Sequence, residues 1–277
     1  MNKGNRVVSA KPISGQNAIE AAGFVVSFSR QLDASELERL LGLQSLLEKD
    51  FPIFNKLAGI GVHISNEQVT AQTSEFQGVI LQKLSSIPGR PSWVLRVNEA
   101  SIQVTCGEYD RWENVWPKAR SYIEATCQFL NVDSLSVVSI GCQVIDKFVY
   151  EEHPERYVLG DVFNPDSEYL PPRTKSSGKL WHAHQGWFEE PNDTRRFKML
   201  TQLNLSSAML NDRLTAVIDY INQIIFDEPV SVTTVMERRN DQCLLDSYFN
   251  DIHDKNKHVL TKLLASGKLT EIGLAQK

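Results

Sequence analysis

Residues 93–130 read WVLRVNEASIQVTCGEYDRWENVWPKARSYIEATCQFL, and their pattern is the most informative in the chain. Its first part contains two short runs, 93–97 and 102–106, in which apolar residues alternate with polar or mixed ones. Residues 98–100 lie between the runs and are suited to a short turn. Alternation with a period of two predicts a β-hairpin with one buried face.

An amphipathic helix is predicted directly after this hairpin. Asp110 can cap its first turn, and Glu113 stands where a capping-box partner reaches back. Pro117 removes one helical hydrogen bond, which predicts a kink or a later start. The stripe that follows has helical spacing and comprises Trp112, Val115, Trp116, Ala119, Tyr122, Ile123, Thr126, Cys127 and Leu130.

The rest of the chain extends this pattern into an α+β fold. Besides the central helix, helices are predicted over 33–51, with Asp33 as cap, and from residue 241 onward. Helices grouped in this way predict a mostly antiparallel sheet with about three main helices packed on one side. The two halves also echo each other loosely, because each combines a helix with a run of strands. Further strands are predicted at 24–28, 78–84, 138–150, 180–188, 196–205 and 214–226.

The domain organisation follows from the same pattern. Residues 1–16 are polar and aperiodic, so a flexible tail is predicted there. Residues 17–277 are predicted to form a single α+β domain, with two sub-units joined near 107–131 as the alternative. Residues 151–179 are rich in proline and form the longest predicted loop, and loops of this length are often functional or disordered.

Composition narrows the class of protein. The chain has 277 residues and a net charge of -5, which argues against a general nucleic-acid binder. Its four cysteines form no C-x-x-C pair, which favours reduced core cysteines over disulfides or a zinc site. No apolar run is long enough to span a membrane, and the N-terminus lacks the apolar core of a secretory signal. We therefore expect a cytoplasmic protein with no membrane contact and no cofactor.

Four segments of the chain carry a family resemblance: 19–52 ending at Phe51-Pro52; Gly78-Val79-Ile80-Leu81 with 93–97 and 101–104; Tyr109-Asp110-Arg111-Trp112-Glu113; and 244–264. With these segments the chain resembles a bacterial family known as the sporadically distributed proteins of unassigned function. The resemblance implies a single compact unit in the cytoplasm, and it assigns no site residue. The patchy distribution of that family is associated with mobile or defence-related genes.

His182 and His184 form the sharpest candidate for a metal site. On a strand, residues two apart point to the same face, so both imidazoles could bind one metal ion. Zinc needs a third protein ligand, and Glu189, Glu190 or His153 could supply it. The alternative interpretation is a polar strand face at the edge of the sheet.

Two other groups could form binding surfaces. Arg195, Arg196 and Lys198 could bind phosphate or nucleic acid, and dispersed surface charge is the alternative. Four aromatic residues around the long loop could anchor a protein partner, and ordinary core packing is the alternative. These aromatic residues are Trp181, Trp187, Phe188 and Tyr169.

Several ionisable residues interrupt apolar patterns. Asp146 and Asp219 lie within apolar strands, where a buried carboxylate is costly unless it is paired. Structural pairing is the favoured interpretation for both, and a pocket is the alternative. A solvated helix face is predicted for the acidic residues and histidines of the last helix, among them Asp246, although His253 could instead pack within the fold.

The leading hypothesis is a non-enzymatic cytoplasmic protein-binding or regulatory subunit of a bacterial defence or toxin-regulating system. It would use a sheet face or residues 151–190. The sequence lacks four common enzyme motifs: the P-loop, the dinucleotide-binding glycine motif, the nucleophile elbow and H-E-x-x-H. Their absence argues against an enzyme. The alternatives are a metal-dependent hydrolase using His182 and His184, and a nucleic-acid-binding adaptor.

Overall fold

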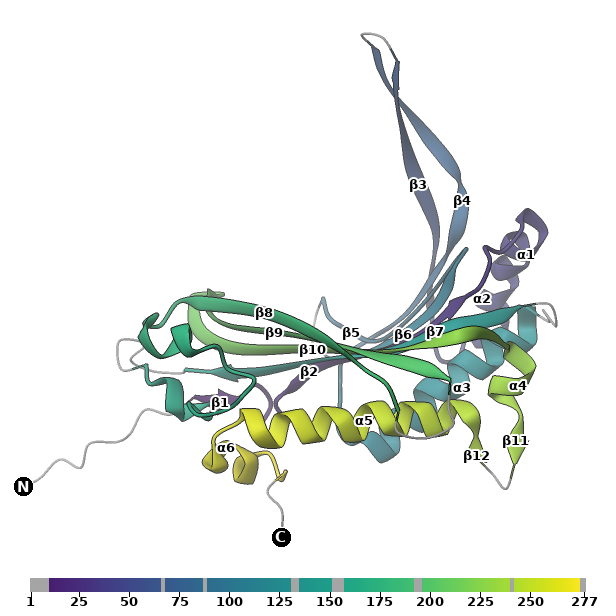
Figure 1. Ribbon diagram of the computed structural model, residues 1–277. Helices are drawn as coiled ribbons and strands as arrows, with labels where there is room; N and C mark the ends of the chain where they lie inside the picture. Colours follow the sequence, from purple (N-terminus) through teal and green to yellow (C-terminus); the bar gives the residue numbers. More distant parts are fainter. Residues whose placement is uncertain are drawn as a thin grey trace, which may run out of the picture.

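The fold is built around one large antiparallel sheet (Figure 1). The computed structural model describes residues 10–65, 68–86, 89–130, 135–150, 157–191, 196–239 and 242–274, with the side chains of 59–75 outside that description. The strands are β1 Lys11–Pro12, β2 Ile19–Phe28, β3 Ile53–Ser65, β4 Gln68–Leu84, β5 Pro91–Asn98, β6 Ser101–Cys106, β7 Ser136–Val149, β8 Trp181–Glu189, β9 Phe197–Leu210 and β10 Arg213–Ser231, with a small separate pair formed by β11 Arg238–Arg239 and β12 Gln242–Cys243. The mixed α+β fold and the mostly antiparallel sheet are therefore confirmed.

The order of the strands gives the sheet two equivalent halves. The order is β3-β4-β5-β6-β2-β7-β10-β9-β8, and β1 pairs with β7 outside this path. The first strands of the two halves, β2 and β7, lie side by side at the centre. The last strand of the first half, β6, pairs with β2, and the last strand of the second half, β10, pairs with β7. The loose echo in the sequence thus has a structural counterpart.

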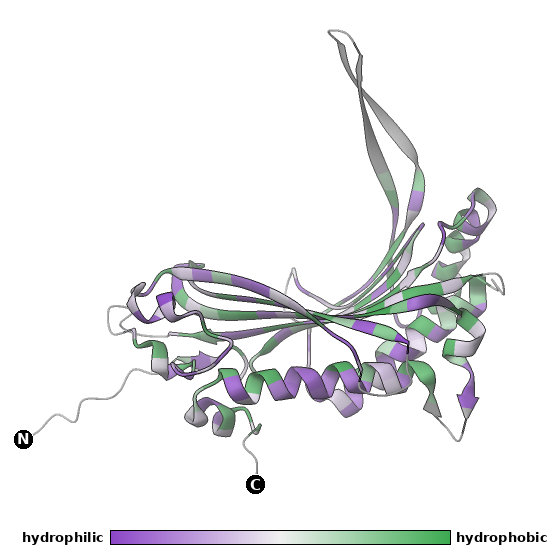
Figure 2. Ribbon diagram, in the orientation of Figure 1, coloured by the Kyte–Doolittle hydropathy of each residue, from purple (hydrophilic) through white to green (hydrophobic). Residues whose placement is uncertain are grey.

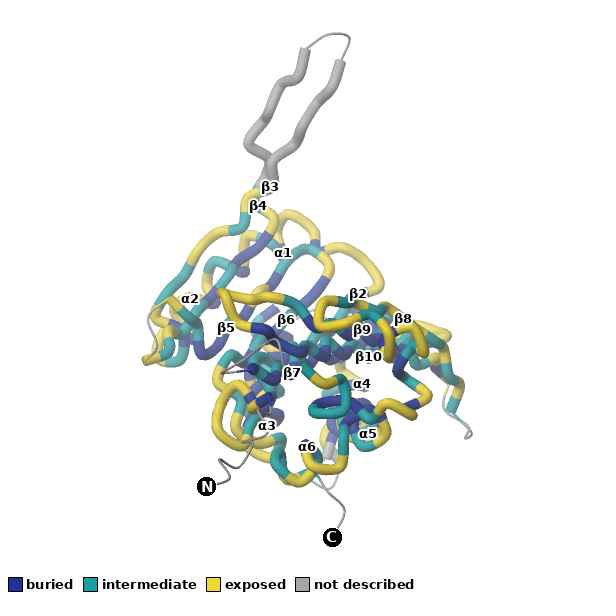
Figure 3. Tube along the Cα trace, turned by 90° about the vertical axis from the view of Figure 1, so that its left-hand side faces the viewer, coloured by how far each residue is buried: buried dark blue, intermediate teal, exposed yellow. Residues whose placement is uncertain are grey.

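Two long helices, α3 (Trp112–Leu130) and α5 (Leu244–Leu263), contact the same face of the sheet. The ring of Phe24 on β2 lies 5.5 Å from that of Trp116 on α3 and 5.7 Å from that of Phe249 on α5. Buried and partly exposed residues alternate along β2, as they do along β9 and β10, so one face of these strands is covered. Figure 2 shows the matching alternation of hydropathy, and Figure 3 shows the buried layer between sheet and helices.

The buried residues form two separate clusters. The larger cluster lies between the sheet and α3 and includes Val144 of β7 and Ile252 of α5. The second lies under residues 157–176 and includes Phe148 of β7 and Val259 of α5. Asp146 on β7 and Asn256 on α5 lie between these members, so both polar residues mark the boundary between the two clusters.

The central sequence stretch forms the predicted hairpin and helix, but the predicted cap at Asp110 is wrong, because the residue before the helix is Arg111. The hairpin of β5 and β6 pairs from Trp93–Cys106 to Val97–Ile102. The predicted stripe of α3 is buried except for the partly exposed Trp112, and Pro117 lies inside the helix. The helix begins at Trp112, and its first backbone hydrogen bonds are accepted by the Arg111 carbonyl. The Asp110 carboxylate accepts hydrogen bonds from the side chain of Asn114, 2.8 and 3.1 Å away.

The predicted helix over 33–51 is broken into three short segments. These are α1 Ala34–Arg39, a 3₁₀ turn at Leu40–Gly42, and α2 Leu43–Leu47. The capping box of Asp33 and Glu36 is confirmed. The tighter turn changes which side chains face inward, because a 3₁₀ helix has three residues per turn. Leu43 is therefore fully buried, and its neighbour Gln44 is exposed.

Other boundaries also differ from the prediction. Residues 10–16 were assigned to the flexible tail, but Lys11–Pro12 pair with β7. Residues 157–179 of the predicted loop contain two 3₁₀ turns, Leu159–Asp161 and Pro172–Ser176, and cover the second buried cluster. The segment directly after β10 forms a short helix, α4, Val232–Met236. A final helix, α6 Ser266–Glu271, continues past the end of α5 and includes Gly267.

Candidate functional site

His182 and His184 lie on β8, the edge strand of the sheet, and both are exposed on the same face. Nδ1 of His184 hydrogen-bonds to the side-chain oxygen of Asn204 on β9. Glu189 lies on the other face of β8, because it is an odd number of residues from His184. His153 lies outside the described residues. Across the described ranges, no three His, Cys, Asp or Glu side chains come together as a metal-binding group.

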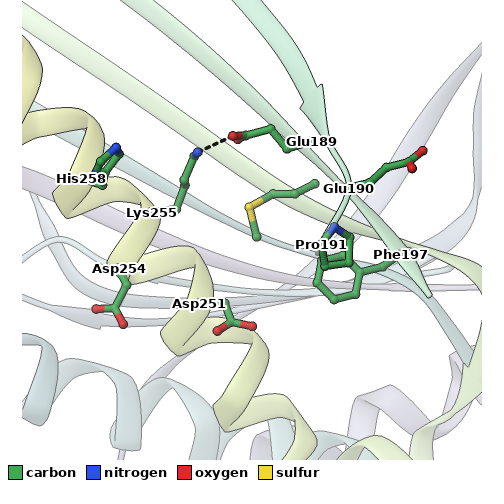
Figure 4. Close-up of a pocket in the computed structure, with 9 residues that line it drawn as sticks. Glu189, Glu190, Pro191, Phe197, Asp251, Asp254, Lys255 and His258 are labelled. Atoms are coloured by element: carbon green, nitrogen blue, oxygen red, sulfur yellow. Dashed lines mark hydrogen bonds and ion pairs between the residues drawn. The ribbon is translucent and has the colours of Figure 1, made fainter. Parts of the chain in front are cut away.

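Glu189 and Glu190 belong instead to a pocket of about 430 Å³ between the end of β8 and α5 (Figure 4). Lys255 of α5 reaches across the pocket and pairs with Glu189, with 2.5 Å between Nζ and Oε1. Asp251, Asp254 and His258 line the α5 side. Glu189, predicted as a third ligand, is thus directed to α5 and away from the two histidines, while the exposed side chain of Glu190 points away from Lys255 (Figure 4).

The four aromatic residues predicted as a partner anchor do not form one surface. Trp181 and Trp187 are half-buried on the helix-covered side, where Trp187 stacks on Tyr169 with ring centroids 5.4 Å apart. The Trp181 indole N–H donates to the hydroxyl of Tyr157, 2.8 Å away. Phe188 alone faces the other side and is 63% exposed. Trp181, Trp187 and Tyr169 therefore pack against the second buried cluster.

The predicted basic group is partly outside the described structure. Arg195 lies among residues 192–195, which are not described. Arg196 and Lys198 are both exposed, and Lys198 lies on β9 directly opposite Ile225 of β10. Lys198 therefore shares the face of the sheet that carries Phe188.

This face, opposite to α3 and α5, carries a distinctive set of partly exposed side chains. We call it the open face, and the register of the strands defines its members. Carboxamide side chains and aliphatic side chains are mixed across it. Its amides are Gln82, Gln103, Gln143, Gln202, Asn204 and Gln223, and its aliphatic residues are Val25, Val94, Ile145, Leu200, Ile221 and Ile225.

Asp219 lies on the open face, and each of its two carboxylate oxygens accepts a hydrogen bond. Its Oδ1 accepts from Nε2 of Gln143, 2.8 Å away, and its Oδ2 accepts from Nδ2 of Asn204, 3.3 Å away. Because Asn204 also binds His184, the chain of contacts crosses four strands. The predicted structural pairing is confirmed for Asp219, with amides as the partners.

Asp146 lies on the covered face and has a different environment. Its side chain is 2% exposed and opens into a cavity of about 480 Å³ between the start of α3, the middle of α5 and residues 14–19. Oδ2 of Asp146 has no hydrogen-bond partner within the described part of the chain. Burial raises the pKa of this carboxyl to about 7. The favoured interpretation of structural pairing is therefore wrong for Asp146, because none of the described donors reaches Oδ2 at this position.

Two residues of α5 complete the wall of this cavity. Asn256 is 6% exposed, and its Nδ2 also lacks a hydrogen-bond partner among the described residues. His253 stacks on Trp112 with ring centroids 4.1 Å apart and an interplanar angle of 4°. Burial lowers the pKa of His253 to about 4, so its imidazole is neutral at pH 7. His253 thus packs within the fold, which was the alternative to the predicted solvated helix face.

Asp246, predicted on a solvated helix face, is in fact buried and paired. Its carboxylate binds the Arg120 guanidinium at 2.7 Å and the Trp116 indole N–H at 2.9 Å. It also accepts from the backbone N–H of Cys243, which caps the start of α5. Burial raises the pKa of Asp246, but the hydrogen bonds from Arg120 and Cys243 outweigh it and hold the pKa below its usual range.

Sequence reasoning did not identify the cavity, although one signal was present. Asn256 interrupts the apolar stripe of α5 between Ile252 and Val259, just as Asp146 interrupts that of β7. A polar residue at an apolar position in each of two elements indicates a shared polar site when those elements pack together. The pairing of β7 with α5, however, cannot be read from either pattern alone.

Comparison of the chain with models of protein families gives no match, and comparison with curated proteins gives none either. Membership of the family described above therefore stays a prediction. Within the described ranges, none of the helices is long and apolar enough to cross a bilayer. The four cysteines are free and buried, as expected for core cysteines.

Proposed function

We propose that the chain is a non-enzymatic binding or regulatory subunit that engages another protein through the open face of its sheet. A cytoplasmic role in a bacterial defence or toxin-regulating system accords with the resemblance noted in the sequence. In this proposal α3, α5 and the α1–α2 segment lie on one side of the sheet and leave the other side for the partner. The mixture of amide and aliphatic side chains on the open face is the observation that carries the proposal.

This mixture is suited to a protein surface. Ile221 on β10, the strand next to β7, lies between Gln143 and Gln202 on the neighbouring strands. Aliphatic groups gain free energy when a partner covers them, and amides can both donate and accept hydrogen bonds with a polypeptide. Phe188 adds an exposed aromatic ring at the β8 edge, and aromatic side chains are enriched at protein interfaces.

The charges on the open face favour a protein partner over nucleic acid. Asp219 is bound by two amides, and Lys147 pairs with Glu20, with 2.5 Å between Nζ and Oε2. Arg96, Lys198 and Arg213, on β5, β9 and β10, are exposed basic residues of this face, and they lie on three separate strands. Nucleic-acid binding sites usually carry a continuous basic patch, because the phosphate backbone supplies most of the affinity.

Affinity recovery of the tagged protein from its host tests the proposal. We expect a stoichiometric protein partner that stays bound after nuclease treatment. Ile221→Glu should abolish recovery by placing a charge at the centre of the interface, and the isosteric Gln202→Glu should weaken it. The control Leu46→Glu, at an exposed position on α2, should retain the partner.

Two results would contradict this function. One is a partner that is lost on nuclease treatment, which would support a nucleic-acid adaptor. The other is a protein partner recovered equally well with Ile221→Glu, which would place the interface elsewhere. Circular dichroism of each variant ensures that loss of recovery reflects the interface rather than unfolding.

A further inference from the structure

The cavity beside Asp146 contains two buried polar atoms that the described residues leave without partners. These are Oδ2 of Asp146 on β7 and Nδ2 of Asn256 on α5. A buried donor or acceptor without a partner costs about 1–3 kcal/mol, so native proteins rarely leave one unsatisfied without a reason. Both residues line one cavity, which indicates that a molecule bound there completes both hydrogen bonds.

The size of the cavity fits a small molecule. Its volume of about 480 Å³ lies within the range of roughly 300–1,000 Å³ that is typical of ligand sites. Its walls come from five parts of the chain, including the start of α3, β7, α5 and the residues after α6. The cavity also lies at the boundary between the two buried clusters, where apolar packing from neither cluster fills the space.

The chemistry of the walls selects a class of ligand. Burial shifts the pKa of Asp146. Among the described residues, no basic side chain pairs with the Oδ2 atom of this carboxyl. Tyr109, Trp112 and His253 also line the cavity, and the rings of Trp112 and His253 stack on each other. Aromatic side chains beside a carboxylate form a favourable environment for an organic cation.

We propose that this cavity binds a small planar organic cation, with its N–H donors on the Asp146 carboxylate and an oxygen acceptor on the Asn256 amide. An amidinium group suits Asp146, because two parallel N–H groups can bind both oxygens of one carboxylate. A hydroxyl or carbonyl oxygen on the same molecule satisfies Nδ2 of Asn256. The site lies on the covered face of the sheet, so it is separate from the proposed protein interface.

Isothermal titration calorimetry with two matched compounds tests this proposal. The probes are 4-hydroxybenzamidine, which is a cation, and 4-hydroxybenzamide, its neutral analogue of the same shape. We expect one saturable site per chain for the amidine, with affinity at least about tenfold higher than for the amide. In Asp146→Asn this preference should disappear. The control Asp110→Asn removes a carboxylate from the exposed rim of the same cavity and should change the affinity less than about twofold.

The pH dependence in the wild-type chain provides a second test that needs no variant. Affinity for the amidine should rise about tenfold between pH 6 and pH 8 as Asp146 ionises, and affinity for the amide should not. His253 stays neutral over this range, because its pKa is about 4. The other ionisable groups that line the cavity are Tyr109, Asp110, Arg111, Glu113 and Lys257.

Three results would overturn the inference. The first is no saturable binding of the amidine at up to about 10 mM, which would mean that the cavity holds only water. The second is an amide that binds as tightly as the amidine. The third is a preference for the amidine that persists in Asp146→Asn or does not change with pH. If Asp146→Asn fails to fold, the pH profile of the wild-type chain decides the question.

Discussion

Asp146 and Asp219 lie on paired strands at almost the same register, yet their environments are opposite. Asp146 is opposite Ile218, and the next pair along the ladder is Ile145 opposite Asp219. The two carboxylates therefore point to opposite faces of the sheet. Asp219 accepts hydrogen bonds from two amides on the open face, while Oδ2 of Asp146 has none from the described residues on the covered face.

The difference shows how the two faces satisfy a polar group. On the open face, neighbouring strands place Gln143 and Asn204 within reach of Asp219. On the covered face, the strand neighbours of Asp146 are Ile19 and Ile218, which offer no side-chain donor. A partner must therefore come from the helices or from a ligand. Asp246 shows the first solution, because α3 supplies it with Arg120 and Trp116.

The largest effect in this comparison is expected at Asp246. Asp246→Ala leaves the Arg120 guanidinium and the Trp116 N–H without their partner in a buried site, which should lower the free energy of unfolding by about 4 kcal/mol. Urea denaturation measures this loss. The control Glu168→Ala breaks an exposed pair with Lys262 and should cost less than about 1 kcal/mol. Equal losses in the two variants would contradict the role assigned to the buried pair.

Asp146→Asn should raise the free energy of unfolding, and the size of this gain should depend on pH. The folded-state pKa of Asp146 is raised to about 7, so ionisation opposes folding and the penalty grows as the pH rises from the unfolded value toward 7. The gain in stability from Asp146→Asn should therefore be roughly 2–3 kcal/mol larger at pH 8 than at pH 5. Urea denaturation at both pH values measures it. A gain that does not change with pH would show that Asp146 is paired.

His253 should respond to pH in the reverse direction. Its folded-state pKa is lowered to about 4, so protonation opposes folding and stability falls as the pH drops from about 6.5 toward 4. His253→Phe keeps a ring on Trp112 but cannot be protonated. It should raise stability by about 1–2 kcal/mol more at pH 4.5 than at pH 7.5, allowing for partial exposure of the imidazole. Thermal unfolding at the two pH values measures this difference. An equal gain in stability at both values would show that the imidazole is well solvated.

The smallest effect is expected at Asp219. Asp219→Asn keeps the size of the side chain but replaces two charge-assisted hydrogen bonds with weaker ones. Stability at pH 7 should fall by about 0.5–1 kcal/mol. Urea denaturation alongside Asp146→Asn makes the contrast direct, because the two isosteric changes should shift stability in opposite directions. If Asp219→Asn raised stability, the carboxylate on the open face would be as unfavourable as the one on the covered face, which would contradict this comparison.

Local patterns predicted the hairpin of β5 and β6, the stripe of α3 and the capping box at Asp33, because each depends on residues close in sequence. The patterns also marked Asp146 and Asp219 as unusual. They could not tell the two apart, because their partners come from other strands and helices. The burial of Asp246 depends on Arg120 and Trp116 of another helix and was missed for the same reason.

The most direct measurement is a carbon-13 NMR titration of the Asp146 carboxyl in the ligand-free protein, with Asp146→Asn used to assign the resonance. A carboxyl buried in the cavity without a hydrogen bond to Oδ2 should titrate near pH 7. Saturation with 4-hydroxybenzamidine should then lower that pKa by about one unit or more, because the bound cation stabilises the carboxylate. A midpoint near 4 in the free protein would show that Asp146 is already solvated or paired, and the contrast with Asp219 would not hold.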